Sequence, residues 1–339
     1  MANTNFQNKS QIEVGIGNGS ANLGTAHANS DTWNFLQVVD FNIEQASAPL
    51  DVAPNKSALM GQLASQGHHR PDTQMYEVTL TMRGTTTAIL KSCLSLFGDG
   101  ASEATLTLAA GAEPNTNNTQ SGSEVQTMTN GAANTSAVTL LFENAGSDAV
   151  AIDVSMAGCF ATSMTMREDV GTNGGEMVLE TTFVTGYRPL ESAFAAPSSK
   201  TLDTGTPKNI FLNTVATLGG NALILNSWEI TIARPLARVG YINTTDYAPY
   251  GYVQTGPYEV TGNIVCKRDD EVYDFLAATK GDSTGIVLAL AESSNFIIDS
   301  QKVMIDNSKP EVGDYMLQNI PFRAFAASEA AEIIGITAT

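Results

Sequence analysis

A strand–helix–strand pattern that occurs twice, at a nearly constant spacing, constrains this sequence more than any other feature. Residues 258–266 alternate apolar and polar side chains, as a half-buried strand does, and residues 285–291 form an almost wholly apolar strand. Between them, residues 268–281 have apolar side chains at helical spacing, an acidic first turn and a closing glycine. The pattern therefore predicts a helix between two strands.

The same pattern occurs in the first half of the chain. Residues 76–82, 87–97 and 105–109 match the first strand, the helix and the second strand. The offsets are 258 − 76 = 182, 281 − 98 = 183 and 288 − 106 = 182. Only Tyr-Glu-Val-Thr and Gly-Asp are identical, so the case rests on the pattern and its constant offset. We therefore expect two tandem copies of one mainly β domain, each with one helix.

A closing pair of strands also recurs. Strands expected at 162–167 and 177–184 return at 302–305 and 315–325, with offsets of 304 − 166 = 138 and 317 − 179 = 138. The first half therefore holds 182 − 138 = 44 more residues between these blocks. Residues 111–136 explain much of this difference, because they are polar and almost free of large apolar side chains. We expect this segment to be an exposed insertion.

Length and composition agree with two domains. A chain of 339 residues is long enough for two cores, and 42% hydrophobic against 15% charged residues is typical of a globular chain with polar loops. Residues 1–30 are rich in Asn, Gly and Ser, which predicts an arm that orders against a partner or not at all. The predicted units are a first domain at 31–190, a linker at 191–209 and a second domain at 210–339.

The net charge of −18 restricts the partners of the chain. Binding to nucleic acid phosphates needs clustered cations, so we expect no DNA affinity. We see no signal-peptide pattern at the start and no apolar run of membrane-spanning length. Cys93, Cys159 and Cys266 lie in apolar segments without metal or redox spacing, which predicts buried free thiols.

Motifs for catalysis or ligand binding are weak. His68 and His69 are adjacent, and neighbours on a strand point to opposite faces, so we interpret them as structural or solvated. Asp269 and Asp270 fit a helix N-terminus. The glycines at 15–19 lack the preceding strand and following helix of a phosphate loop, and neither a nucleophile elbow nor a P-loop motif occurs. We predict no catalytic, metal or cofactor site and no enzymatic activity.

Two long connections occur at the same place in both copies. They span 45–73 and 233–256, whereas hairpin loops usually have about two to five residues. Their length and their Pro, Tyr and Met content favour a role in assembly. The interface residues that we single out are Pro54, Met60, His68, Tyr241, Tyr247, Tyr250 and Tyr252.

The order of these elements resembles that of the tail tube proteins of long-tailed phages and related viruses. The local likeness is strongest at 228–232, in the long loop that follows, at 258–262 and at 267–270. It looks like the strand–loop–strand–helix unit of two-domain major tail proteins. The resemblance covers residues 33–109, 138–190 and 222–326.

This resemblance implies a β-sandwich or rolled barrel flanked by one helix in each domain. It implies a structural virion protein, assembled in the host cytoplasm, that polymerises into stacked rings of a hollow tail tube. Two domains per subunit would make the ring a trimeric pseudo-hexamer. Genomic DNA would pass through the lumen without specific binding, and other tail proteins would bind at the tube ends. A bare, flexible tail of the siphovirus type is the default expectation.

Two other classes remain open from the sequence. Another virion ring component, such as a tail terminator, baseplate or decoration protein, shares these folds. A secreted β-sandwich binding module also fits a β-rich chain, although the embedded helices and the lack of a signal-peptide pattern count against it. Electron microscopy separates the three classes, since they form long tubes, isolated rings or monomers.

Overall fold

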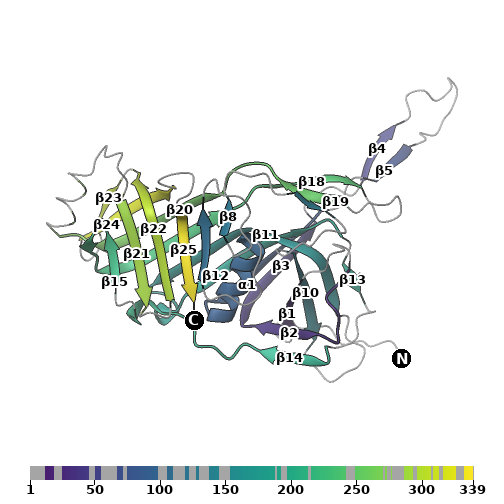
Figure 1. Ribbon diagram of the computed structural model, residues 1–339, viewed down its shortest axis with the longest axis horizontal. Helices are drawn as coiled ribbons and strands as arrows, with labels where there is room; N and C mark the ends of the chain where they lie inside the picture. Colours follow the sequence, from purple (N-terminus) through teal and green to yellow (C-terminus); the bar gives the residue numbers. More distant parts are fainter. Residues whose placement is uncertain are drawn as a thin grey trace.

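The structure, a computed structural model, describes most of the chain with gaps. It is mainly β-strand, as expected, and most strands belong to one large mixed sheet (Figure 1). The described residues are 12–18, 25–45, 50–54, 67–71, 75–97, 105–109, 119–121, 127–129, 137–144, 153–187, 189–191, 197–212, 215–241, 249–269, 272, 276, 286–292, 296–306, 308–312, 316–325 and 332–338.

Eight antiparallel strands form a continuous sheet through the body of the molecule. Their spatial order is β3–β6–β12–β11–β17–β20–β24–β22, with four strands from each half of the chain. The sheet therefore passes from one half to the other without a break. The bounds are β3 (Val38–Gln45), β6 (Tyr76–Arg83), β12 (Val178–Thr185), β11 (Val154–Asp169), β17 (Leu225–Ala233), β20 (Glu259–Lys267), β24 (Met316–Ala324) and β22 (Phe296–Ile305).

Alternation of side chains gives this sheet one apolar and one polar face. In β6, Val78, Leu80 and Met82 are fully buried, whereas the residues between them are only half-buried. In β17, Ile230 and Ile232 are buried in the same way. These side chains belong to one apolar core cluster that extends over both halves of the chain.

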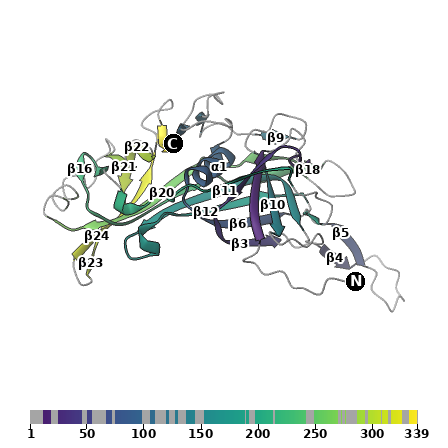
Figure 2. The same cartoon turned by 90° about the horizontal axis from the view of Figure 1, so that it is seen from below.

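The apolar face is covered by strands from both halves of the chain and by the helix α1 (Thr86–Phe97). In Figure 2, α1 lies on one side of β11 and β12. Its polar side chains also reach the sheet, because the Thr181 hydroxyl donates to Ser92 Oγ at 2.9 Å and the Ala161 N–H donates to Ser95 Oγ at 3.0 Å. The covering strands are β1 (Ile12–Asn18), β2 (Thr32–Leu36), β10 (Val138–Asn144), β15 (Val215–Leu218), β16 (Asn221–Ala222), β21 (Ile286–Glu292) and β25 (Glu332–Ala338).

The remaining elements are short and lie mainly at the borders of the sheet or in hairpins. Two of the pairings, β14 with β2 and β7 with β8, are parallel. The bounds are β4 (Leu50–Pro54), β5 (Gly67–Pro71), β7 (Thr105–Ala109), β8 (Thr119–Ser121), β9 (Thr127–Thr129), β13 (Leu190–Glu191), η2 (Asn173–Gly175), β14 (Ser199–Leu202), η3 (Ile210–Leu212), β18 (Leu236–Tyr241), β19 (Pro249–Gln254) and β23 (Lys309–Val312).

Strand pairing follows the same order in the two halves. The first half pairs as β2–β1–β10–β11–β12–β6–β3 and the second as β16–β15–β21–β22–β24–β20–β17, with every pair antiparallel. A register shift also occurs at the corresponding place, between Val138 and Leu140 in β10 and between Ile286 and Leu288 in β21.

Two details of the sequence alignment are wrong. The strand at 105–109 does not have the pairing of the strand at 285–291, because β7 pairs with β25 and β8, whereas β21 pairs with β15 and β22. Two short apolar strands at a similar distance from a helix look alike in sequence, and only their partners distinguish them. If Leu80 is matched with Gly262 at the offset of 182, their ladder partners Thr181 and Phe322 give 322 − 181 = 141 for the closing strands, not 138.

The expected arm holds a strand of the core. Val14 and Ile16 in β1 are buried, so the prediction of an arm does not hold for residues 12–18. The glycines hid this strand, and they are needed for packing. The Phe35 ring lies 3.1 Å from where a Cβ of Gly15 would be, and the His27 ring would collide with one on Gly17.

Other expected segments are described only in part. Of the helix expected at 268–281, Arg268 and Asp269 are described and are not helical, whereas Val272 and Leu276 are helical, and the rest lies outside the described residues. Within 111–136, the backbone of β8 pairs with β7 and that of β9 pairs with β19, and the rest lies outside the described residues. In the linker, β14 pairs with β2, and all four of its residues are exposed.

Buried tyrosines predict a loss of stability in alkali. Burial raises the pKa of Tyr187 to about 12 and raises the pKa of Tyr252 and of Tyr258. Above pH about 10 the unfolded chain releases these protons and the folded chain retains them, so unfolding becomes more favourable as the pH rises. Urea midpoints measured from pH 8 to pH 11 should fall above pH 10, and fall less in Tyr252→Phe. A midpoint that is independent of pH over this range contradicts the assignment.

Candidate functional site

The two halves meet along an antiparallel pair, β11 with β17, which we call the junction. Seven pairs of Cα partners run from Ser163 opposite Ala233 to Asp169 opposite Ser227. Side chains reinforce the ladder across both faces of the sheet. The Thr165 and Thr231 hydroxyl oxygens are 2.9 Å apart, and Trp228 Nε1 donates to Glu168 Oε2 at 2.7 Å. Arg167 lies opposite Glu229, which places opposite charges side by side on the polar face.

A second contact ties the second half to α1. Arg234 Nη2 donates to the carbonyl oxygens of Ser95 and Ala161, at 3.0 and 2.9 Å, and Tyr258 Oη donates to the Leu96 carbonyl at 2.9 Å. All of these groups are buried. Ser95 and Leu96 are in the last turn of α1, where carbonyls lack helical partners and a cation is favourable. The orientation of the two halves is thus set by directed hydrogen bonds as well as by packing.

In the part of the chain that the structure describes, the continuous sheet ends at β3 on one side and at β22 and β23 on the other. Among the described strands, β3 pairs only with β6. At the other end, β21 pairs with β22 as far as Val303. After Val303, the edge formed by Met304 and β23 has only β24 as a partner among the described strands. Val39 is 67% exposed and Val312 is 81% exposed. Exposed edges with apolar side chains are templates for pairing with another chain.

The polar face of the sheet has more acidic than basic side chains. One row of Cα partners crosses all eight strands, from Asp40 through Thr81, Glu180, Thr165, Thr231, Thr261 and Arg323 to Met304. By strand alternation the acidic residues of this face are Asp40, Glu44, Glu77, Asp169, Glu180, Glu229 and Glu259, and the basic ones are Arg83, Arg167, Lys267, Lys302 and Arg323. Arg83 is paired with Glu176 and Arg323 with Asp306.

Each long connection contains a two-stranded hairpin. The hairpin β4–β5 follows β3 and the hairpin β18–β19 follows β17, and because β3 and β17 run in the same direction both hairpins leave the same rim of the sheet. Figure 1 shows β4 and β5 standing away from the body of the molecule. The second hairpin is joined by β9 to form a three-stranded sheet.

The seven expected interface residues have different fates. Met60 and Tyr247 lie outside the described residues, and four others lie on the hairpin strands: Pro54 in β4, His68 in β5, Tyr241 in β18 and Tyr250 in β19.

Tyr252 has a place inside the chain. It is fully buried, its ring centroid is 4.9 Å from that of Phe160, and its hydroxyl accepts the N–H of Gly186. Its ring therefore fills a core position and is not presented to a neighbouring subunit.

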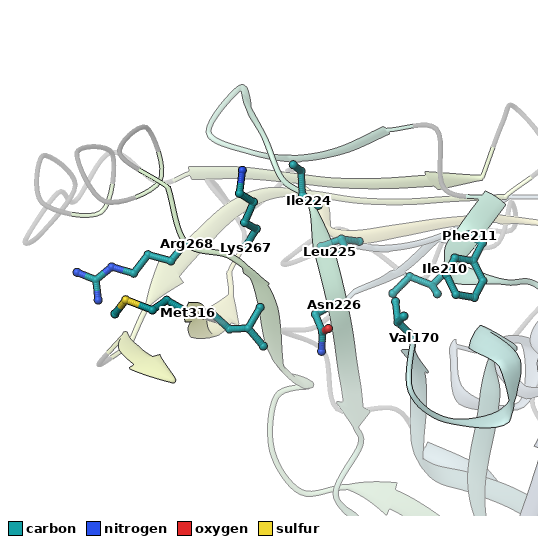
Figure 3. Close-up of a pocket in the computed structure, with 10 residues that line it drawn as sticks. Val170, Ile210, Phe211, Ile224, Leu225, Asn226, Lys267, Arg268 and Met316 are labelled. Carbon is teal, nitrogen blue, oxygen red and sulfur yellow. The ribbon is translucent and has the colours of Figure 1, made fainter. Parts of the chain in front are cut away.

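An apolar hollow of about 600 Å³ opens at the rim opposite the hairpins, where β17 begins. Figure 3 shows Val170, Ile210 and Phe211 on one side of it and Lys267, Arg268 and Met316 on the other. Phe211 is 63% exposed, Ile224 62% and Met316 51%. Exposed apolar patches of this kind mark contact sites. Sequence reasoning missed the hollow because its residues come from segments far apart in the chain.

Among the described residues, no group of three or more His, Cys, Asp or Glu side chains is placed to hold a metal ion. No helix in the described part of the chain is long and apolar enough to span a membrane. Cys93, Cys159 and Cys266 are buried free thiols, as predicted, and burial raises the pKa of Cys159 to about 12 and that of Cys266 to about 11.

No protein-family model matches the chain, and a search of curated proteins finds no significant match.

Arg234 should contribute strongly to stability. Arg234→Met removes both donors from the buried carbonyls of Ser95 and Ala161, and each unsatisfied group costs about 1–3 kcal/mol. Urea denaturation should show the loss in the free energy of unfolding. Arg323→Met is the control, because its exposed ion pair with Asp306 is worth about 0–1 kcal/mol. Equal stability of the two variants would show that the junction does not depend on Arg234.

Proposed function

We propose that this chain is a structural virion protein whose rings stack into the hollow tail tube of a long-tailed phage or related virus. The observation that carries the proposal is the junction, where β17 of the second half extends the sheet of the first half through β11. A chain built in this way can repeat the same contact with the next chain. The proposal agrees with the resemblance of the sequence to tail tube proteins.

The two halves are copies of one tail-tube-like domain. The common pairing order of seven strands and the matching register shift support this duplication. Packing adds support at one pair of equivalent positions. In the first half Leu80 lies opposite Thr181, and in the second Gly262 lies opposite Phe322, whose ring would collide with any Cβ on Gly262. The side-chain volume that is smaller at Gly262 than at Leu80 is thus offset by the larger side chain of Phe322 at the position of Thr181. Such compensation is expected of two copies that diverged on the same backbone.

Repetition of the junction produces a ring. One end of the sheet exposes β3, which is the counterpart of β17. The other end exposes the end of β22 with β23, which is the counterpart of the part of β11 that pairs with β17. A head-to-tail contact of this kind closes into a ring when the rotation fits, and closure removes both exposed edges. Three two-domain subunits would form a pseudo-hexamer.

The polar face of the sheet suits a lumen for DNA. Its threonines and excess of carboxylates offer no cluster of cations to phosphates, and Arg83 and Arg323 are held by carboxylates. Binding by release of counterions is therefore weak, and DNA can pass without adhering. The apolar face and α1 then lie outside the lumen wall.

Stacking requires contacts above and below the ring. The hairpins leave one rim of the sheet and the apolar hollow opens at the other. The hairpins of one ring would pack against the hollow of the next, and at the tube ends other tail proteins would take one of these places. The assembly would form in the host cytoplasm and reside in the virion tail.

Negative-stain microscopy of the purified chain should show long hollow tubes. Rings that never stack would favour a tail terminator, baseplate or decoration protein, and monomers at high concentration would overturn the proposal. A gel-shift assay at physiological salt should show no DNA binding, because the net charge is −18 and the polar face is acidic. Tight DNA binding would contradict a lumen wall of this kind.

The hollow should be needed for stacking and not for ring formation. The double variant Phe211→Ser, Ile224→Ser removes two exposed apolar side chains from the hollow, so rings should persist and tubes should be lost or strongly shortened. Leu202→Ser is the matched control, since Leu202 is 59% exposed on β14 and does not line the hollow. Normal tubes from the double variant would exclude the hollow as the stacking surface.

A further inference from the structure

We propose that β3 of one chain pairs antiparallel with the edge formed by Met304 and β23 of a second copy, in the register of the junction. This inference rests on the proposed ring assembly and specifies its contact residue by residue. It follows from the pairings within the chain, which show both which strands correspond and how they are aligned.

The counterpart of β17 is β3. The common Tyr-Glu-Val-Thr segment aligns β6 with β20 at an offset of 182, which places Leu80 at the position of Gly262. Leu80 pairs with Phe41, and Gly262 pairs with Ile230. The offset between β3 and β17 is therefore 230 − 41 = 189.

The counterpart of the junction edge of β11 is the end of β22 together with β23. In the first half, Leu80 pairs on its other side with Thr181, and Thr181 pairs with Met164. In the second half, Gly262 pairs on its other side with Phe322, and Phe322 pairs with Ile305. The offset at this position is 305 − 164 = 141. The second half has one extra residue on this edge after Ile305. Arg167 pairs with Val178 and Lys309 pairs with Asn319. The offset is therefore still 319 − 178 = 141 on the partner strand, but it becomes 309 − 167 = 142 on the edge itself.

The same side of the edge is open in the second half. In the first half, β10 covers β11 as far as Cys159, and β17 then covers it from Ser163. In the second half, β21 covers β22 as far as Val303. From Met304 onward no described strand takes the place that β17 occupies in the first half.

Transfer of the junction register produces complementary partners. Met164 opposite Ile232 becomes Ile305 opposite Ile43, and both isoleucines are partly buried against the core of their own half. Arg167 opposite Glu229 becomes Lys309 opposite Asp40. An apolar pair on the core side and an opposite-charge pair on the polar side thus recur, although the residue types have changed.

The contact is heterologous, so each chain supplies one edge of each kind. Two chains related by a two-fold axis would place β3 against β3 and leave the β22–β23 edge open. The proposal therefore excludes a symmetric dimer through β3 and requires head-to-tail addition.

Cysteine cross-linking tests the register. Ser163 opposite Ala233 in the junction becomes Met304 opposite Glu44, and both of the latter are exposed. We expect Glu44→Cys and Met304→Cys chains, mixed and mildly oxidised, to give a covalent dimer, whereas each variant alone gives none. The doubly substituted chain should give covalent oligomers up to the closed ring. The three native thiols are buried, so they need not be removed.

Two controls are matched to this pair. The double variant Ser163→Cys, Ala233→Cys occupies the corresponding ladder position inside one chain and should form an intramolecular cross-link. Glu44→Cys mixed with Val312→Cys is out of register by eight residues and should give no dimer. A dimer from Glu44→Cys alone would reveal a two-fold contact and overturn the proposal.

The outcomes separate this inference from the proposed function. Rings in the microscope without the Glu44–Met304 cross-link would refute the register and leave ring assembly standing, and monomers with no cross-link would refute both. A second measurement does not depend on cysteine. Lys309→Glu places like charges opposite each other and should slow assembly several-fold, whereas Lys309→Arg should not, and equal rates for the two variants would count against the contact.

Discussion

The ladder between β11 and β17 is the constraint on which the rest of this structure depends. Strand edges carry backbone N–H and C=O groups that must find partners, and β17 satisfies the edge that β11 leaves open after Cys159. This pairing makes one sheet out of two halves. It also determines that the polar faces of both halves lie on the same side, and among the described strands it leaves β3 at one border of the sheet and the edge formed by Met304 and β23 at the other.

Local patterns in the sequence predicted the strands well, and partners only in part. Alternation at residues 76–82 and 258–266 marked β6 and β20, because buried side chains on a half-buried strand recur at every second residue. The strand β1 was missed, since Gly15 and Gly17 resemble a flexible loop until Phe35 and His27 are seen to occupy the space. The match of 105–109 to 285–291 was wrong, because the partners of a strand depend on distant parts of the chain.

For the candidate surfaces too, the sequence predicted local features but not contacts between distant segments. Long loops at equivalent places were visible in the sequence, and four of the chosen residues are on the hairpins. The junction, the hollow and the buried position of Tyr252 were not visible, since each depends on residues brought together from several segments. Arg234 falls within the long connection expected at 233–256, and only the carbonyls at the end of α1 explain why a cation is buried there.

The hydrogen bonds from Arg234 and Tyr258 to the last turn of α1 have a mechanical consequence. A hinge between the halves would have to break buried donors away from backbone carbonyls, in addition to opening a strand ladder. The chain is therefore stiff along the direction in which its two halves follow each other. In the assembly that we propose, the two halves follow each other around the ring, so each ring would be stiff along its circumference. A tail that bends would then deform mainly at the contacts between successive rings, and the diameter of the lumen would stay constant along the curve.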